Sequence, residues 1–214
     1  KSVRGGIPIC WPWFGDARKN PVEVQRILPQ GELPAHGWVR DKPWLLDSVT
    51  SDEAGVLLRF IFPDKNALPL PFPKDIELSL EIHIGAELSL CLTTHNGSDQ
   101  TIQFSQALHS YFAVSNIDQV QVKNLEGVHY IDTLDEWCKK SDAKALSIDQ
   151  ETDRIYLDTP EEIVIADTGW QRELSVRTRH SKSAVVWNPW TEKSKRLSQF
   201  EDDAYVGMLC VESA

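Results

Sequence analysis

Several features are scarce in this 214-residue chain, and each scarcity excludes a class of protein. Positive charge is in deficit, because 22 Lys and Arg face 32 Asp and Glu, for a net charge of -10 at pH 7. This balance argues against nucleic acid and anionic membrane surfaces as partners. No apolar run reaches the ~18 residues of a membrane-spanning helix, and no secretion signal is recognisable at the start of the chain.

Cysteine is also scarce and widely spaced. Cys10, Cys91, Cys138 and Cys210 form no CxxC pair, and no Cys/His spacing is typical of a zinc site. In a chain without a secretion signal, this pattern favours reduced, mostly buried thiols. We therefore predict a cytoplasmic protein without disulfides and without a metal.

Helical periodicity is rare, whereas alternation typical of strands is frequent. Apolar residues occupy every second position of Asp75–Ile84, Gly85-Ala86 forms the expected turn, and the alternation resumes at Leu88. Short helices are expected only in Leu134–Lys140 and Thr191–Phe200, and the Pro-rich Ala67–Lys74 is expected to be a stiff loop. Further strands are predicted at Gly55–Phe62, Thr101–Phe104, Val120–Lys123, Arg154–Leu157, Glu162–Ala166, Leu174–Arg177, Ala184–Trp187 and Val206–Val211. The pattern predicts one all-β domain, an antiparallel sandwich or barrel.

Four places carry residues suited to chemistry. Arg4 opens the segment RGGIPICWPWFG, in which a cation stands beside much apolar surface and thus favours an anionic ligand. Arg40 ends the segment AHGWVR, and His109 lies in ALHSYF on an apolar strand. Glu212 follows the apolar run Met208–Val211, where burial would suit a carboxylate to act as a general base. Each signal alone is weak, because most tryptophans and histidines in such segments are structural residues that pack or form hydrogen bonds within the core.

The ordered set of segments resembles one family. RGGIPICWPWFG, HGWVR, ALHSYF, TDRIY, WNPW and CVE follow one another as in the glucose-6-phosphate 1-epimerases, a branch of the aldose 1-epimerase (galactose mutarotase-like) superfamily. The resemblance runs from Val3 to Glu212. It implies an antiparallel β-supersandwich with few short helices, in which a groove on one face binds the sugar.

The resemblance also implies a role for each candidate residue. His109 would be the general acid and Glu212 the general base. Arg4 and Arg40 would hold the substrate and its phosphate, and Asp153 would accept hydrogen bonds from sugar hydroxyls. His36 would help to orient the sugar, while Ala35 stands where some members carry Gln.

The chemistry implied is the cofactor-independent interconversion of the α and β anomers of hexose 6-phosphates, with a small-molecule substrate and neither nucleic acid nor membrane as partner. Ring opening and closure need one acid and one base, provided that both reach the same sugar from opposite sides. A mutarotase for free aldoses and a catalytically silent sugar-phosphate-binding module remain alternatives. A glycosidase is disfavoured, because Glu212 lacks a second candidate carboxylate. The preferred hexose 6-phosphate and the oligomeric state are not predicted.

The two ends of the chain differ from the family pattern. The chain does not begin with Met, Arg4 stands close to its start, and Glu212 is followed by two residues only. Family members have strands before the RGG segment and continue past the CVE glutamate. We therefore expect residues 1–214 to form a single mutarotase-like domain without its first strands and its extreme C-terminus.

Overall fold

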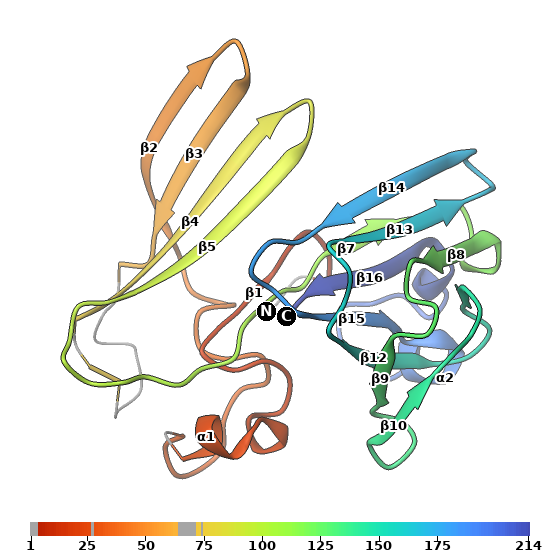
Figure 1. Cartoon of the computed structure of the whole chain (residues 1–214), viewed down its shortest axis with the longest axis horizontal. Helices are drawn as coiled ribbons and strands as arrows, with labels where there is room; N and C mark the ends of the chain where they lie inside the picture. Colours follow the sequence, from red (N-terminus) through yellow and green to blue (C-terminus); the bar gives the residue numbers. More distant parts are fainter. Residues whose placement is uncertain (1–3, 27, 64–71, 74) are drawn as a thin grey trace. The chain divides into compact units, whose positions relative to one another are not determined.

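A computed structural model describes residues 4–26, 28–63, 72–73 and 75–214 (Figure 1). Nearly all of its regular structure consists of antiparallel β-strands, as predicted. The chain divides into two compact units, of which the first contains residues 1–9 and 107–214 and the second residues 10–106.

The first unit contains the largest sheet. Its strands follow the order β1-β6-β16-β15-β12-β9-β10, and β7 also pairs with β16. The bounds are β1 (Ile9–Cys10), β6 (Ala107–Leu108), β7 (Tyr111–Ala113), β9 (His129–Asp132), β10 (Cys138–Ser141), β12 (Thr152–Leu157), β15 (Ser183–Asn188) and β16 (Met208–Ser213). Most of these strands are formed by the second half of the chain, which carries the candidate residues His109, Asp153 and Glu212.

A second sheet of the same unit covers one face of the first. It contains β11 (Leu146–Ser147), β8 (Val120–Lys123), β13 (Glu162–Asp167) and β14 (Arg172–Arg177), in that order. Alternate residues of both sheets meet in one apolar core, with Ile163 and Ile165 from β13 and Leu209 and Val211 from β16. This packing of two inner faces is the sandwich that the alternation predicts.

The second unit contains a four-stranded sheet of successive hairpins. Its order is β2-β3-β4-β5, with bounds β2 (Leu45–Asp52), β3 (Gly55–Ile61), β4 (Ile76–Gly85) and β5 (Leu88–Asn96). A separate cluster buries Trp13, Ala17 and Val24, of which Val24 belongs to a short helix, α1 (Val22–Gln25). The sequence analysis expects most tryptophans in the core. Trp11 and Trp13 are fully buried, which favours core packing for both.

A single glycine allows the two aromatic segments of this unit to meet. Gly37 has φ +80°, and a β-carbon there would lie 2.0 Å from the carbonyl oxygen of Trp11. The N–H of Trp38 donates to that same oxygen at 2.8 Å. Only glycine permits so close an approach in this backbone conformation.

Helical structure is short. Besides α1 there is α2 (Trp190–Ser194), and single 3₁₀ turns occur at Ala17–Lys19, Ile117–Gln119 and Ala204–Gly207. In the described part of the chain, no helix has the length and apolarity that a membrane crossing requires.

Most predicted strands are confirmed, but two local predictions are wrong. Thr101–Phe104 forms no strand, and Ser105 next to it bonds to the loop at Pro12 and Phe14 instead. Leu134–Lys140 is a turn leading into β10, because Glu136 and Trp137 take positive φ values that end any helix. The short helix expected in Thr191–Phe200 is confirmed, since α2 occupies Trp190–Ser194.

The hairpin of the second unit is confirmed with two corrections. The connection is Ala86-Glu87 rather than Gly85-Ala86, with Gly85 closing it by a hydrogen bond to the carbonyl of Glu87. The alternation buries Ile76 and its neighbours near the base of the hairpin, but Ile84 and Leu88 at the tip are 50% and 59% exposed. The predicted core face therefore extends over only part of the strands.

The cysteine prediction is half correct. None of the four cysteines forms a disulfide, and Cys10 and Cys210 are buried, but Cys91 and Cys138 are exposed. Most of the predicted loop Ala67–Lys74 lies outside the described residues, apart from Phe72, which is buried, and Pro73.

Candidate active site

The last strand, β16, sorts its side chains between the two faces of the large sheet. Leu209 and Val211 enter the sandwich core, so Cys210 and Glu212 project from the opposite face. All four side chains are buried, and Glu212 is only 2% exposed. A carboxylate buried to this degree on the face away from the apolar core is the first mark of a functional site.

His109 reaches Glu212 because both flanking strands pair with β16. Leu108 of β6 lies opposite Ser213, and Tyr111 of β7 lies opposite Cys210, so His109 lies between these two points beside Glu212. The His109 Nδ1 and Glu212 Oε1 atoms are 3.3 Å apart. His109 is 6% exposed, and the structure thus brings an acid–base pair into direct contact out of water.

Two aromatic side chains hold the imidazole of His109. The ring of Tyr111 stacks on it in parallel, with centroids 4.8 Å apart and planes inclined by 5°. The indole of Trp187 meets both rings edge-on, at 6.1 Å from His109 and 6.2 Å from Tyr111. These contacts fix the plane of the imidazole, which a directional proton transfer requires.

Asp153 belongs to the same face of the sheet. Strand pairing places Tyr111, Cys210, Trp187 and Asp153 in one row across β7, β16, β15 and β12. Side chains opposite one another on paired strands share a face. Asp153 lies two strand spacings from Cys210, about 10 Å.

Asp153 also lines a pocket of about 390 Å³ that is formed by the loop before β12 and by β9 and β10. Burial raises the pKa of Asp153 above the usual range, and the charges of Glu151 and Asp132 act in the same direction. The charge of Lys193 and a hydrogen bond from Thr133 offset part of that increase. A partly buried carboxyl in a polar pocket can bind hydroxyl groups.

Arg4 lies in the same unit, on a segment that runs beside the His109 loop. The carbonyl of Pro8 accepts the N–H of His109 at 3.0 Å, and the carbonyl of Gly6 accepts the N–H of Tyr111 at 2.9 Å. Gly6 has φ +68°, a left-handed conformation that glycine adopts without strain. The Arg4 Nε donates to the carbonyl of Ser198 at 3.3 Å, which anchors the guanidinium group of a half-buried side chain.

His36 and Arg40 belong to the second unit. The His36 backbone has φ +66°, and its Nδ1 lies 3.4 Å from the Cys10 Sγ and accepts the N–H of Gly15 at 3.3 Å. Its ring also meets Phe14 edge-on at 5.2 Å. Arg40 is partly buried. The structure thus brings together His109, Glu212 and the row to Asp153 in one unit. The roles assigned to these residues, like those of His36 and Arg40, stay predictions.

A family model described as aldose 1-epimerase matches residues 1–214. The chain belongs to the aldose 1-epimerase family. It is an isomerase of the epimerase class, as the sequence predicts.

Relatives of this epimerase agree with that membership. A protein of Escherichia coli K12 named "Putative glucose-6-phosphate 1-epimerase" is 34% identical over 220 residues, which are 100% of this chain and 67% of that protein. A protein of Cenchrus ciliaris with the same name is 32% identical over 227 residues, covering 100% of this chain and 64% of its own length. The epimerase therefore spans about two thirds of the length of these relatives.

Solved structures agree with the fold. A crystal structure from Salmonella typhimurium, described as a "putative mutarotase", matches the epimerase with a TM-score of 0.86 at 31% identity, over 100% of this chain and 67% of that one. A galactose mutarotase-like protein of Clostridium acetobutylicum shares the fold at 14% identity, with a TM-score of 0.66 over 97% of this chain and 68% of that one. The predicted galactose mutarotase-like, all-β class is confirmed.

Three residues of the epimerase near His109 received no firm role from the sequence: Tyr111 and Trp187, which contact its ring, and Cys210, which lies beside Glu212. Tyr111 and Trp187 lie within ALHSYF and WNPW, where nothing distinguishes a residue on the site face from one in the core. For Cys210 the alternation of side chains along a strand was an available signal. Cys210 is two positions from Glu212, so both project from the same face. Trp187 lies opposite Cys210 on the paired strand, and this pairing is known only from the sheet topology.

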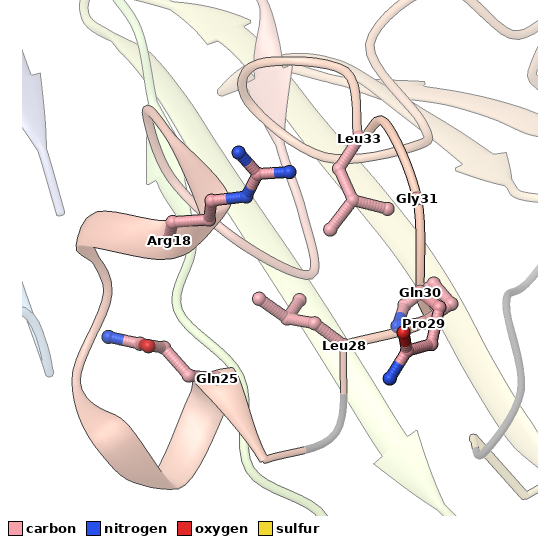
Figure 2. Close-up of a pocket in the computed structure, with 7 residues that line it drawn as sticks. All are labelled: Arg18, Gln25, Leu28, Pro29, Gln30, Gly31 and Leu33. Carbon is pink, nitrogen blue, oxygen red and sulfur yellow. The ribbon is translucent and has the colours of Figure 1, made fainter.

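The epimerase has another hollow, of about 260 Å³, in its second unit (Figure 2). Figure 2 shows Leu28 and Leu33 pointing into it, with the Arg18 guanidinium at its rim. None of the predicted site residues lines it. Among the described residues, the group able to hold a metal ion is His109, Cys210 and Glu212.

Proposed function

We propose that this epimerase interconverts the α and β anomers of hexose 6-phosphates without a cofactor, with His109 as general acid and Glu212 as general base. The observation that carries the proposal is the buried contact of 3.3 Å between the His109 Nδ1 and the Glu212 Oε1. In a member of the aldose 1-epimerase family, a buried acid–base pair on the site face of the sheet is the group best suited to the reaction.

The reaction needs two coupled proton transfers. The Glu212 carboxylate removes the proton of the C1 hydroxyl while the protonated His109 donates to the ring oxygen. The C1–O5 bond breaks and a carbonyl forms at C1. After rotation about C1–C2, the C5 hydroxyl attacks the other face of the carbonyl. On closure Glu212 returns its proton to the carbonyl oxygen and His109 takes the proton of the C5 hydroxyl, so both regain their starting state.

From the direct contact we infer that the two groups need not act from opposite sides of the sugar. The two oxygens that exchange protons are bonded to the same carbon, so an acid and a base lying side by side can serve both. The starting state also places an imidazolium beside a carboxylate, and their attraction offsets part of the cost of burying each charge. Tyr111 and Trp187 limit the rotation of the imidazole between the two transfers.

The substrate contacts are proposed from the remaining predicted residues. Arg4 and Arg40 bind the phosphate, for which guanidinium groups offer paired donors. Asp153 accepts bonds from sugar hydroxyls, and His36 helps to orient the ring. The names of the relatives, which specify glucose 6-phosphate, support a phosphorylated substrate. For Arg40 and His36 the assignment rests on the family resemblance alone.

The setting proposed for this activity is one domain, residues 1–214, acting in the cytoplasm on a small molecule. The cytoplasmic assignment rests on the four cysteines, which form no disulfide. The single-domain assignment rests on the family model, which matches residues 1–214.

The test follows the anomers directly. Relaxation of freshly dissolved α-glucose 6-phosphate is measured by NMR exchange with and without the protein, with free glucose and galactose as matched substrates. Acceleration of the phosphate ester alone is the expected result. Equal acceleration of free sugars would instead indicate a mutarotase for free aldoses. Binding without acceleration would indicate a sugar-phosphate-binding module and contradict catalysis by this chain.

A further inference from the structure

A third side chain stands beside the acid–base pair and has no part in the proposed reaction. Cys210 is fully buried, two positions before Glu212 on β16, and projects from the same face. One ligand atom from each of His109, Cys210 and Glu212 lies within 4.8 Å of the other two. These three residues are called the HCE cluster below.

We propose that the HCE cluster is an inhibitory site for a divalent cation that binds thiolates, such as Zn²⁺. The inhibitory part of this inference rests on the proposed function, whereas the binding part does not. The site would switch off catalysis by occupying the two groups that transfer protons.

The separations within the cluster suit a small tetrahedral ion. Bond lengths of ~2.0–2.2 Å to nitrogen and oxygen place two such ligands of a tetrahedral zinc ~3.4 Å apart. The His109 Nδ1 and Glu212 Oε1 are 3.3 Å apart without any ion. The thiol has to approach until its sulfur lies ~3.6 Å from its neighbours, since Zn–S bonds are ~2.3 Å. From within 4.8 Å this requires a shift of about 1 Å, which a side-chain rotation supplies.

The donor set selects the class of ion. One thiolate, one imidazole and one carboxylate combine a soft, a borderline and a hard ligand, a set that suits zinc and similar metals. Calcium and magnesium prefer oxygen ligands throughout and suit this set less well. With Cys210 and Glu212 ionised and His109 neutral, the two negative charges balance the two positive charges of the ion. The bound site is then neutral, so burial costs little.

Binding and catalysis exclude each other through the protons. The ion requires the Cys210 thiol to release its proton, and it requires a His109 nitrogen without one. A bound ion therefore occupies the lone pairs of His109 and Glu212 that exchange protons with the sugar. Affinity for the ion should rise with pH, because protons compete for the same ligands.

The experiment measures binding and activity separately on the chelator-treated protein. Co²⁺, which replaces Zn²⁺ with visible absorption, is titrated to look for one equivalent bound with a thiolate-to-metal charge-transfer band. Zn²⁺ should then displace it. In parallel, anomer interconversion is measured against free Zn²⁺ held by a metal buffer, and excess chelator should restore the rate.

Two variants locate the ligand. Cys210→Ala and Cys210→Ser should lose the thiolate band and bind Zn²⁺ at least about 100-fold more weakly, since even partners beyond the direct ligands change affinity by 10–100-fold. Both should keep interconversion activity but lose its inhibition by Zn²⁺. Cys138→Ala, which removes an exposed thiol, is the matched control and should behave as the parent. Using two replacements guards against one that fails to fold, which circular dichroism would detect.

Each result decides the inference. A thiolate band that survives in Cys210→Ala, a band that disappears in Cys138→Ala, or the absence of stoichiometric binding would overturn the site. Binding that leaves the interconversion rate unchanged would overturn its inhibitory role. If the chelator-treated protein has no activity, the proposed function fails and the inhibitory role with it. The Co²⁺ spectrum still decides whether the site exists.

Discussion

The two faces of β16 are equally buried but differ in polarity. On one face Leu209 and Val211 pack into the apolar core between the sheets, and on the other Cys210 and Glu212 stand beside His109. All four positions are buried, so burial alone does not separate a structural residue from a functional one. Polarity distinguishes the two faces, because burying a carboxylate costs free energy unless a partner stabilises its charge.

This difference predicts opposite responses to substitution. Removing a methyl group from the core face leaves a cavity and lowers stability, while the chemistry is unaffected. Replacing a charge on the site face by an amide of similar shape keeps the packing and removes the proton transfer. Substitutions on the two faces should therefore differ in whether they change the stability or the rate of interconversion.

Removing the acid or the base should have the largest effect. His109→Asn and Glu212→Gln should each slow anomer interconversion by ~10²–10⁴-fold, the usual contribution of one positioned proton-transfer group. The rate is measured by NMR exchange with α-glucose 6-phosphate. A cooperative thermal transition confirms that each variant is folded. Near-full activity in either variant would contradict the role assigned to that residue.

The core face should respond in stability. Leu209→Ala should lower the free energy of unfolding by about 2–5 kcal/mol, because the buried side chain leaves a cavity between the sheets. Urea denaturation measures this loss. Below the transition, the interconversion rate per folded molecule should match the parent. A large loss of that rate in a fully folded sample would show that the two faces are not separable.

The arginine predictions ask how far substrate binding extends beyond the site face. Arg4→Ala and Arg40→Ala should each weaken binding of glucose 6-phosphate by ~10–100-fold, which corresponds to loss of a charge-assisted hydrogen bond of about 1.5–3 kcal/mol. Binding of free glucose should change far less. Titration calorimetry with both ligands gives the comparison. Arg59→Ala, which removes an exposed cation paired with Asp47, is the control. Equal losses for both ligands would make the substituted arginine structural.

The smallest effect concerns pH and Asp153. Burial raises the pKa of Asp153 above its usual 3.8, so its protonated form is the one that folding favours. Its contribution to stability is present below pH 3.8 and is lost as the pH rises through the raised value. Asp153→Asn, which mimics the protonated form, should therefore gain stability relative to the parent across that window. Urea denaturation over a pH series measures the difference.

Asp167 provides a control of opposite sign. Burial opposes its ionisation, but hydrogen bonds from the Ser115 hydroxyl, from the N–H groups of Ser115 and Trp170, and the charge of Arg172 hold the pKa of Asp167 below the usual value. Its contribution is present above pH 3.8 and is lost as the pH falls through the lowered value. Asp167→Asn should thus lose stability relative to the parent as pH rises. Parallel curves for both variants would contradict the directions of these shifts.

Local patterns were sufficient for most of the strands but not for their ends. The alternation in Asp75–Ile84 predicts β4 to within a residue, because side chains on a strand alternate between faces whatever lies beside it. The helix predicted at Leu134–Lys140 is wrong because its seven residues are too short for periodicity to outweigh turn formation at Asp132 and Asp135. The strands β2, β9, β10 and β11 were missed, since pairing rather than composition stabilises them.

The sequence by itself determined an acidic, all-β epimerase and its candidate acid and base, since these follow from composition, period-two alternation and an ordered set of family segments. Only the tertiary structure decided which side chains meet. His109 and Glu212 are over a hundred positions apart, and their 3.3 Å contact exists because β6 and β7 both pair with β16. The same register places Cys210 beside them. Spacing along the chain did not reveal that these three side chains lie together, because they converge only through strand pairing.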